Sequence, residues 1–145
     1  RTIYQVLTDR FARNDGSTAD CSNLGNYCGG GYIGLKNHLD YIQGMGFDAI
    51  WISPIIDNYD GGYHGYWGRN INALNNHFGT ETDFVNFVTA CHEKGIWVMV
   101  DVVANHMGNT NQSYSANSPF NSADHYHDYC IISDNDFATK NQNRI

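Results

Sequence analysis

Two short, almost entirely apolar segments constrain the fold of this chain more than any other feature. They are Phe47–Ile52 and Ile96–Val103, and Asp101 is the one charged residue of the second. Both are rich in β-branched and aromatic residues, which is typical of buried strands. Continuous apolar runs of this kind occur in parallel sheets that are covered on both faces. We therefore expect two strands buried on both faces, with Asp101 inside the second.

A helical pattern precedes each of these strands. Apolar residues recur every three or four positions over 35–45, which predicts one helix ending at glycines. The same spacing over 84–91 predicts a second helix, with Thr80 or Thr82 as the N-cap and Gly95 just past the end.

The remaining segments complete an alternating order. Ile3–Leu7 predicts a first strand that ends in a polar turn, whereas 13–34 and 55–79 are rich in glycine and predict loops. The order strand, helix, strand, helix, strand predicts an α/β fold with parallel strands. Such a unit fits part of an open sheet or part of a barrel. A closed eight-stranded barrel needs about 250 residues, more than the 145 present.

Charge and hydropathy exclude several functional classes. Eight Lys and Arg face fifteen Asp and Glu, giving a net charge of -7. This argues against a nucleic-acid partner and against attachment to anionic lipid. No apolar run approaches the roughly 18 residues that span a bilayer. The chain opens on Arg1 with no charged and apolar leader pattern, so we expect a mature N-terminus or a cut piece. Four Cys suit a secreted protein, and Asn111 begins its one glycosylation sequon.

An aromatic motif follows the second predicted strand, where sites of parallel α/β proteins lie. In Tyr63–Trp67, the four ring-bearing residues are interrupted only by Gly65. Such rings stack on the apolar faces of sugars. The alternative is that they pack the loop onto its own domain.

A polar motif, Asp101–His106, follows the third predicted strand. A buried Asp is costly unless paired, so Asp101 is either an ion-pair partner or a catalytic carboxylate. The amide oxygen of Asn105 can ligate a hard cation such as calcium, and His106 can donate to a ligand. The alternative is an asparagine turn beside a satisfied histidine.

Together, these motifs resemble those of the α-amylases of glycoside hydrolase family 13. Asp101–His106 resembles the first signature region of that family, and Tyr63–Trp67 resembles its substrate loop after the second strand. Leu7–Ala12, Leu39–Phe47 and Cys28–Gly30 resemble the secreted fungal enzymes of the Taka-amylase type. The resemblance covers most of the chain and weakens after residue 130.

The resemblance implies a (β/α)8 barrel with a small domain inserted after the third strand. Residues 1–106 would then be the first three strands and two helices of the barrel, and 107–145 the start of the insertion. The chain would be an N-terminal fragment of a secreted, monomeric enzyme.

The implied activity is retaining, endo-acting hydrolysis of α-1,4-glucosidic bonds in starch, glycogen or maltooligosaccharides. Retention needs two carboxyl groups about 5 Å apart. The family's signatures for these groups do not occur in this sequence, so we expect no catalytic residue here. Two alternatives stay open: a non-catalytic carbohydrate-binding homologue, or another family 13 enzyme such as a maltogenic amylase or glucosyltransferase.

The resemblance also implies roles for individual residues. Tyr66 would stack under the sugar at the cleavage site, Trp67 would contact the neighbouring sugar, and His64 would line the same wall. His106 would hydrogen-bond the sugar. Asn105 would be a calcium ligand, with the other ligands beyond this chain.

Further expectations concern structural residues. Asp101 would support the barrel core by pairing with an arginine outside the chain. Cys21 and Cys28 are expected to form a disulfide, Cys91 to be reduced and buried, and Cys130 to pair downstream. Gly25 and Asn26 replace a Gln-Lys pair of the family, which weakens the expectation of a substrate contact there.

Overall fold

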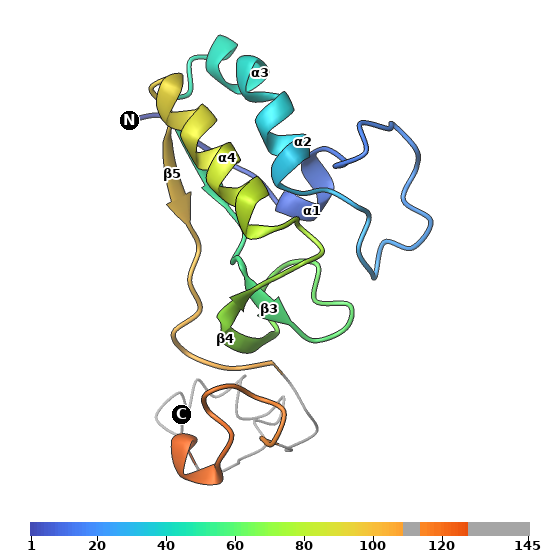
Figure 1. The fold of residues 1–145 in the computed structure, drawn as a ribbon, viewed down its shortest axis with the longest axis vertical. Coiled ribbons are helices and arrows are strands. Elements are labelled where there is room, and N and C mark those ends of the chain that lie inside the picture. The colour runs from blue at the N-terminus through green and yellow to red at the C-terminus, as the bar shows by residue number, and fades with distance from the viewer. Residues whose placement is uncertain (109–113, 128–145) are drawn as a thin grey trace, which may run out of the picture.

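The computed structural model describes residues 1–108 and 114–127. Its centre is a three-stranded parallel sheet in the order β1-β2-β5, formed by Ile3–Gln5, Ala49–Ile52 and Trp97–Val100 (Figure 1). The strands are shorter than the apolar runs predicted, but their order and direction confirm the α/β prediction. As in all parallel sheets, the carboxyl ends of the three strands meet at one edge.

Helices α2, α3 and α4 lie on one face of this sheet (Figure 1). The helices are α1 (Thr8–Phe11), α2 (Tyr32–Asn37), α3 (Leu39–Gly44), α4 (Glu81–Glu93) and a 3-10 turn η1 (Ala123–His125). Helix α1 occupies the place where a polar turn was expected, and it follows β1 directly.

The core lies between the sheet and these helices. The strand register places Tyr4, Ile50 and Val98 side by side, and their side chains pack in this core. Its fully or nearly fully buried members are Tyr32, Leu35, Leu39, Ile42, Ile50, Ile52, Phe78, Phe87, Cys91 and Ile96. Apolar burial of this extent is the main source of the fold's stability.

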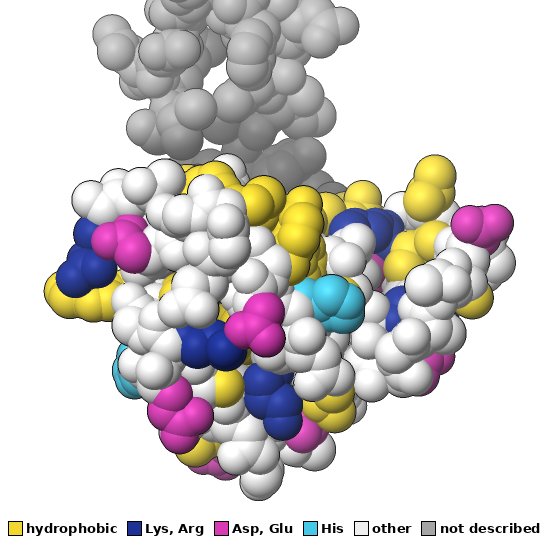
Figure 2. Space-filling view, turned by 90° about the horizontal axis from the view of Figure 1, so that it is seen from above, with side chains coloured by type: hydrophobic (Ala, Val, Ile, Leu, Met, Phe, Trp, Pro, Cys, Tyr) yellow, Lys and Arg dark blue, Asp and Glu magenta, His cyan; other side chains and the backbone are white. Residues whose placement is uncertain are grey.

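The opposite face of the sheet is open in the part of the chain that the structure describes. Trp97 and Met99 on β5 are 61% and 39% exposed, and Ile3 on β1 is 47% exposed. Figure 2 shows hydrophobic side chains gathered along one side of the molecule. The expectation that β5 is buried on both faces was therefore wrong here, because β5 is an edge strand and the helices cover only one face.

The predicted helix over 35–45 is two helices that break at His38. The His38 side chain explains the break: its Nδ1 lies 2.8 Å from the Gly34 carbonyl oxygen. This is the carbonyl that the backbone N–H of residue 38 would use in a continuous helix. That N–H instead donates to the oxygen of Leu35, at 3.1 Å.

The long segment 55–79 is a hairpin and not a structureless loop. Strands β3 (Ile56–Asn58) and β4 (Gly68–Leu74) pair antiparallel beyond the carboxyl edge of the main sheet. Ser118 adds to this hairpin, because the N–H of Ile71 donates to its carbonyl at 3.1 Å. The segment 114–127 thus lies beside β4 (Figure 1).

Helix α4 begins at Thr80, one of the two N-caps predicted. The Thr80 hydroxyl accepts the N–H of Asp83 at 3.1 Å, and the Asp83 carboxylate accepts the N–H of Thr80 at 2.9 Å. This reciprocal capping box satisfies two backbone donors. At the other end Gly95 has φ +70°, the left-handed conformation predicted for a helix-ending glycine.

The disulfide between Cys21 and Cys28 is confirmed, with their Cα atoms 5.2 Å apart. Cys91 is a free, buried thiol, and burial raises its pKa to about 12. The expectations for Cys130 and Asn111 fall outside the described residues. None of the described helices is both long and apolar enough to cross a bilayer.

Candidate substrate-binding site

The aromatic loop, residues 59–67, joins β3 to β4. Hydrogen bonds to its backbone groups hold it in one conformation. The buried side chain of Asn58 accepts the Trp67 N–H at 2.7 Å, and the Tyr59 N–H donates to the Trp67 carbonyl at 2.9 Å. Gly65 has φ +88°, and a Cβ there would lie 2.7 Å from the Pro54 oxygen. Both the backbone conformation and this close approach require glycine between the rings.

Tyr66 is tied to Asp101 across the carboxyl edge of the sheet. The phenol hydroxyl donates to Asp101 Oδ2 at 2.7 Å. This hydrogen bond, together with burial and the nearby charge, raises the pKa of Tyr66. Asp101 lies just past the end of β5 and is half-buried, which corrects the prediction that it sits inside a buried strand. Within the described residues, Asp101 is hydrogen-bonded to a tyrosine, and the arginine expected to pair with it would lie outside the chain.

His64 holds the neighbouring rings in place. Its Nδ1 accepts the Tyr66 N–H at 3.0 Å, so the neutral ring carries its proton on Nε2. Its ring stacks against that of Tyr66 at 5.8 Å and meets the Trp67 ring edge-on at 4.9 Å. Burial lowers the pKa of His64, which favours this neutral form.

His106 joins the same cluster from the next strand end. Its Nε2 lies 3.0 Å from the Tyr66 carbonyl oxygen, and since a carbonyl only accepts, Nε2 carries the hydrogen. The structure therefore brings residues 40 positions apart into contact, as the strand order predicted. Tyr66 and Trp67 remain 39% and 45% exposed, so both rings can be reached from solvent.

Two cavities adjoin this cluster. One, of about 310 Å³, lies at the strand ends and is lined by Tyr66 and Asp101 together with Gln5, Val6, Leu7, Trp51, Ile52 and Ser53. The other, of about 430 Å³, is lined by residues that include Asn105, His106 and Phe120. Trp67 lines neither of the two. A single cleft shared by Tyr66, Trp67 and His106 stays a prediction.

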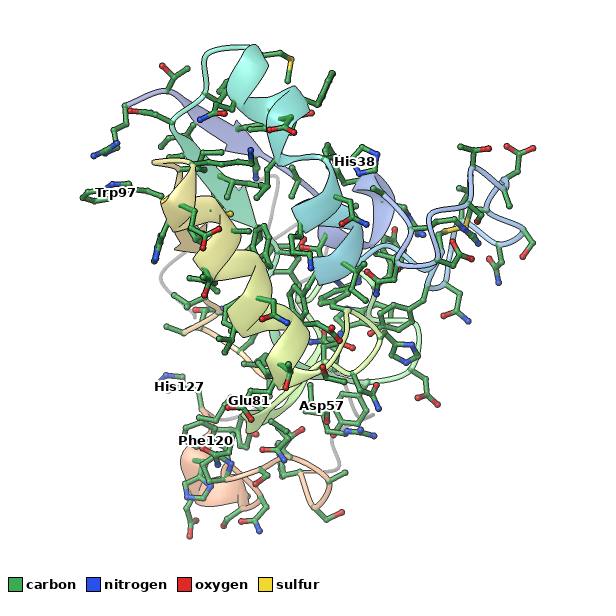
Figure 3. All side chains as sticks on the ribbon, turned by 45° about the horizontal axis from the view of Figure 1, so that its top comes forward. His38, Asp57, Glu81, Trp97, Phe120 and His127 are labelled. Atoms are coloured by element: carbon green, nitrogen blue, oxygen red, sulfur yellow. A yellow bond between two sulfur atoms is a disulfide. The ribbon has the colours of Figure 1, made fainter. Side chains whose placement is uncertain are left out.

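The sites lie at one end of the molecule. Figure 3 shows Phe120 and Asp57 at the end opposite to Trp97. Trp97 begins β5, whereas Asp101 follows its last residue. The aromatic cluster and both cavities thus occupy the carboxyl edge of the sheet, where sites of parallel α/β folds lie.

Asn105 offers one oxygen to a cation. It is exposed, and its amide oxygen is the kind of donor that calcium prefers. Calcium takes six to eight oxygens, and in 1–108 and 114–127 no group of three His, Cys, Asp or Glu residues is arranged to hold a metal. The described residues fit a single ligand and not a complete site.

Sequence reasoning missed two residues that organise the cluster. Asn58 has no sequence signal, because any polar residue in a glycine-rich loop looks alike before the loop is folded. Arg10 stacks its guanidinium on Tyr63, 3.8 Å from the ring centroid. Its position beside Asp9 at a strand end was a signal that could have marked it.

Comparison with known families decides between an open sheet and a barrel. The family model described as "Alpha amylase, catalytic domain" matches residues 5–144. The chain belongs to the α-amylase family. Its fold is therefore the beginning of a (β/α)8 barrel, with three parallel strands and their helices present, as the resemblance implied.

Yeast α-amylases are among the similar curated proteins. Alpha-amylase 3 of Schizosaccharomyces pombe is 50% identical over 91% of this chain and 26% of its own length. Alpha-amylase 1 of Lipomyces kononenkoae is 50% identical over 92% of this chain and 23% of its own length. The chain thus spans about a quarter of the length of these relatives.

Solved structures agree in fold. An α-amylase from Malbranchea cinnamomea superposes with a TM-score of 0.84 at 49% identity, covering 96% of this chain and 32% of that one. A cyclomaltodextrin glucanotransferase, CldA, has a TM-score of 0.66 at 42% identity, covering 74% of this chain and 26% of that one. A variant of AmyP solved in complex with maltotriose has a TM-score of 0.65 at 30% identity over 74% and 24% of the two chains.

Proposed function

We propose that this chain is the N-terminal part of a secreted, monomeric, retaining α-amylase that cleaves internal α-1,4-glucosidic bonds in starch or glycogen. The chain supplies one sugar-binding wall of the cleft, and the catalytic groups come from the remainder of the barrel. Membership of the α-amylase family and the 45–50% identity to yeast α-amylases support this proposal.

The observation that carries the proposal is the exposed pair Tyr66 and Trp67. Burying an aromatic ring is favourable. These two rings are nevertheless held in exposed positions by hydrogen bonds to their backbone and by contacts with His64. A flat, pre-positioned ring can stack on the CH face of a glucose unit without losing further rotamer freedom, because its conformation is already restricted.

Hydrogen bonds would orient the sugar on these rings. His106 uses Nε2 on the Tyr66 carbonyl, which leaves Nδ1 for a sugar hydroxyl. Asp101 accepts the Tyr66 hydroxyl through Oδ2, so its carboxylate fixes the tilt of that ring. The nucleophile and the proton donor of a retaining mechanism would lie outside this chain, because the family's signatures for them do not occur in it. The two groups would be about 5 Å apart.

Calcium belongs to the proposal as a structural ion. Asn105 would contribute one oxygen where the barrel meets the segment after residue 106. An ion held there would fix the loop that carries His106, which is the next residue. The chain's own contribution is to present this oxygen next to the sugar-binding histidine.

The 42% identity to a glucanotransferase supports a second candidate function, that of a family 13 transferase. A transferase would use the same wall to bind glucan but would pass the glucosyl unit to another sugar. The yeast α-amylases match a larger share of the chain, 91–100% against 74%, which favours hydrolysis.

The experiment is product analysis with the complete enzyme that contains this segment. Incubation with maltoheptaose, followed by NMR of the first products, should show α-anomeric maltooligosaccharides and a fall in mean length. Products longer than the substrate would indicate a transferase. No cleavage at all would support the non-catalytic alternative, and a β-anomer would contradict retention.

A further inference from the structure

Arg10 lies where two loops meet at the carboxyl edge of the sheet. Its guanidinium donates to the carbonyl oxygens of Leu24 at 2.6 Å and Asn26 at 2.9 Å, and it also contacts the sulfur of Cys28. All three acceptors belong to the disulfide loop, residues 21–28. The planar face of the same group stacks on Tyr63, 3.8 Å from the ring centroid.

Asp9 forms an ion pair with Arg10 and holds its guanidinium in place. Its fully buried carboxylate pairs with Arg10 Nη1 at 2.6 Å and accepts the N–H groups of Cys28 at 2.8 Å and Gly29 at 3.3 Å. A buried carboxylate needs such partners, because an unpaired one would be strongly destabilised. The result is a guanidinium held in one orientation, with its side chain 21% exposed.

Tyr63 connects this guanidinium to the sugar-binding rings. Its ring meets that of His64 edge-on at 5.1 Å, and His64 in turn contacts both Tyr66 and Trp67. The two loops also approach each other directly: a Cβ on Gly61 would lie 3.7 Å from the oxygen of Gly25. The disulfide loop and the aromatic loop thus form one continuous surface.

We propose that Arg10 is a positioning residue that clamps the disulfide loop to the aromatic loop and so sets the affinity for maltooligosaccharides. The proposal rests on the proposed function. Arg10 does not touch the sugar; it acts through Tyr63 and His64 on the rings, and through Leu24 and Asn26 on the adjoining loop. Because it acts on binding and not on bond cleavage, its loss should raise KM and leave kcat almost unchanged.

The test measures KM, kcat and the dissociation constant for maltoheptaose in the complete enzyme. Arg10→Met keeps an unbranched apolar stem, shorter than that of arginine, but removes both the stack and the donors. The cation–π contact predicts a rise in KM of about five-fold. Tyr63→Leu removes both the stack on Arg10 and the edge-on contact with His64, and it should have a similar effect. Tyr63→Phe retains the ring and should restore most of the affinity.

Two controls separate positioning from general stability. Arg1→Met removes a comparable stack, on Trp97 at 3.9 Å, together with an ion pair to Asp48, at the other end of the sheet. It should leave KM unchanged. In addition, the effects of Arg10→Met and Tyr63→Leu should not add in the double variant, because each breaks the same contact.

The outcomes separate the two proposals. If the unaltered enzyme binds maltoheptaose but Arg10→Met and Tyr63→Leu lower only the melting temperature, the clamp is refuted and the proposed function stands. Additive effects on KM would also refute it. If the unaltered enzyme neither binds nor cleaves the sugar, both proposals are overturned.

Discussion

At the scale of single residues, the site depends on a few groups whose hydrogen-bonding or steric role is fixed by their surroundings. His64 must accept through Nδ1, Asp101 must accept from a phenol, and Gly65 must lack a side chain. The sequence motifs predicted His64 as a substrate-binding residue and Asp101 as a structural one. They did not show that Asp101 receives Tyr66, because that contact depends on how the loop between β3 and β4 folds back over the sheet edge.

Protonation of His64 should destabilise the aromatic loop. A protonated Nδ1 carries a hydrogen and cannot accept the Tyr66 N–H. Burial lowers the folded-state pKa below the ordinary value of 6.5, so the stabilisation is complete above about pH 6.5 and is lost as the pH falls through the folded pKa.

The measurement is the free energy of unfolding of the complete enzyme between about pH 7.5 and about pH 5.5. His64→Gln should flatten part of the acid-side decline. The exposed His92 on α4 gives the matched control, since His92→Gln should leave the profile as it was. Identical profiles for His64→Gln and the unaltered enzyme would rule this role out.

At the scale of elements, hydrophobic periodicity predicted the helices and strands whose apolar faces pack in the core. It missed a helix break and a hairpin that depend on particular side-chain and backbone contacts. Helix α4 and the three strands were all predicted from their apolar patterns, although β5 is buried on one face only. The break at His38 and the hairpin β3–β4 were not predicted, because they depend on one side-chain contact with Gly34 and on pairing between segments ten residues apart.

The capping box at Thr80 should contribute measurably to helix α4. Thr80→Ala removes the side-chain acceptor of the Asp83 N–H and should cost about 1 kcal/mol of unfolding free energy. Thr82→Ala, an exposed change in the same first turn, is the control and should cost much less. Denaturant unfolding of both variants checks this, and equal losses would show that the cap contributes nothing of its own.

At the scale of the whole molecule, the sheet has a covered face and an open one in the part of the chain that the structure describes. Helices cover one side of the sheet, while Trp97 and Met99 on the other side are 61% and 39% exposed. In the complete (β/α)8 barrel of this family, strands from the rest of the protein would close around this open face. The family resemblance predicted that arrangement, whereas hydropathy alone predicted a strand buried on both sides.

The 145 residues alone should neither hydrolyse starch nor hold calcium firmly. The family's signatures for the two catalytic carboxyl groups do not occur in this sequence, and Asn105 supplies one oxygen where calcium needs six to eight. Reducing-sugar release and calorimetric calcium titration of the purified chain measure the two properties. Turnover clearly above a heat-killed control would assign chemistry to Asp101, and a micromolar calcium site would show ligands that we have placed elsewhere.

The most direct test of the central claim is the dissociation constant of maltoheptaose for the complete enzyme carrying Trp67→Ala. Stacking on an aromatic ring predicts a rise of about ten-fold or more, with little change in melting temperature, because Trp67 is already 45% exposed. Tyr41→Ala on α3, where the ring is 57% exposed but lies away from the site, should leave the constant unchanged. If Trp67→Ala unfolds the protein and leaves the affinity of the folded fraction intact, the rings pack the loop and do not bind sugar.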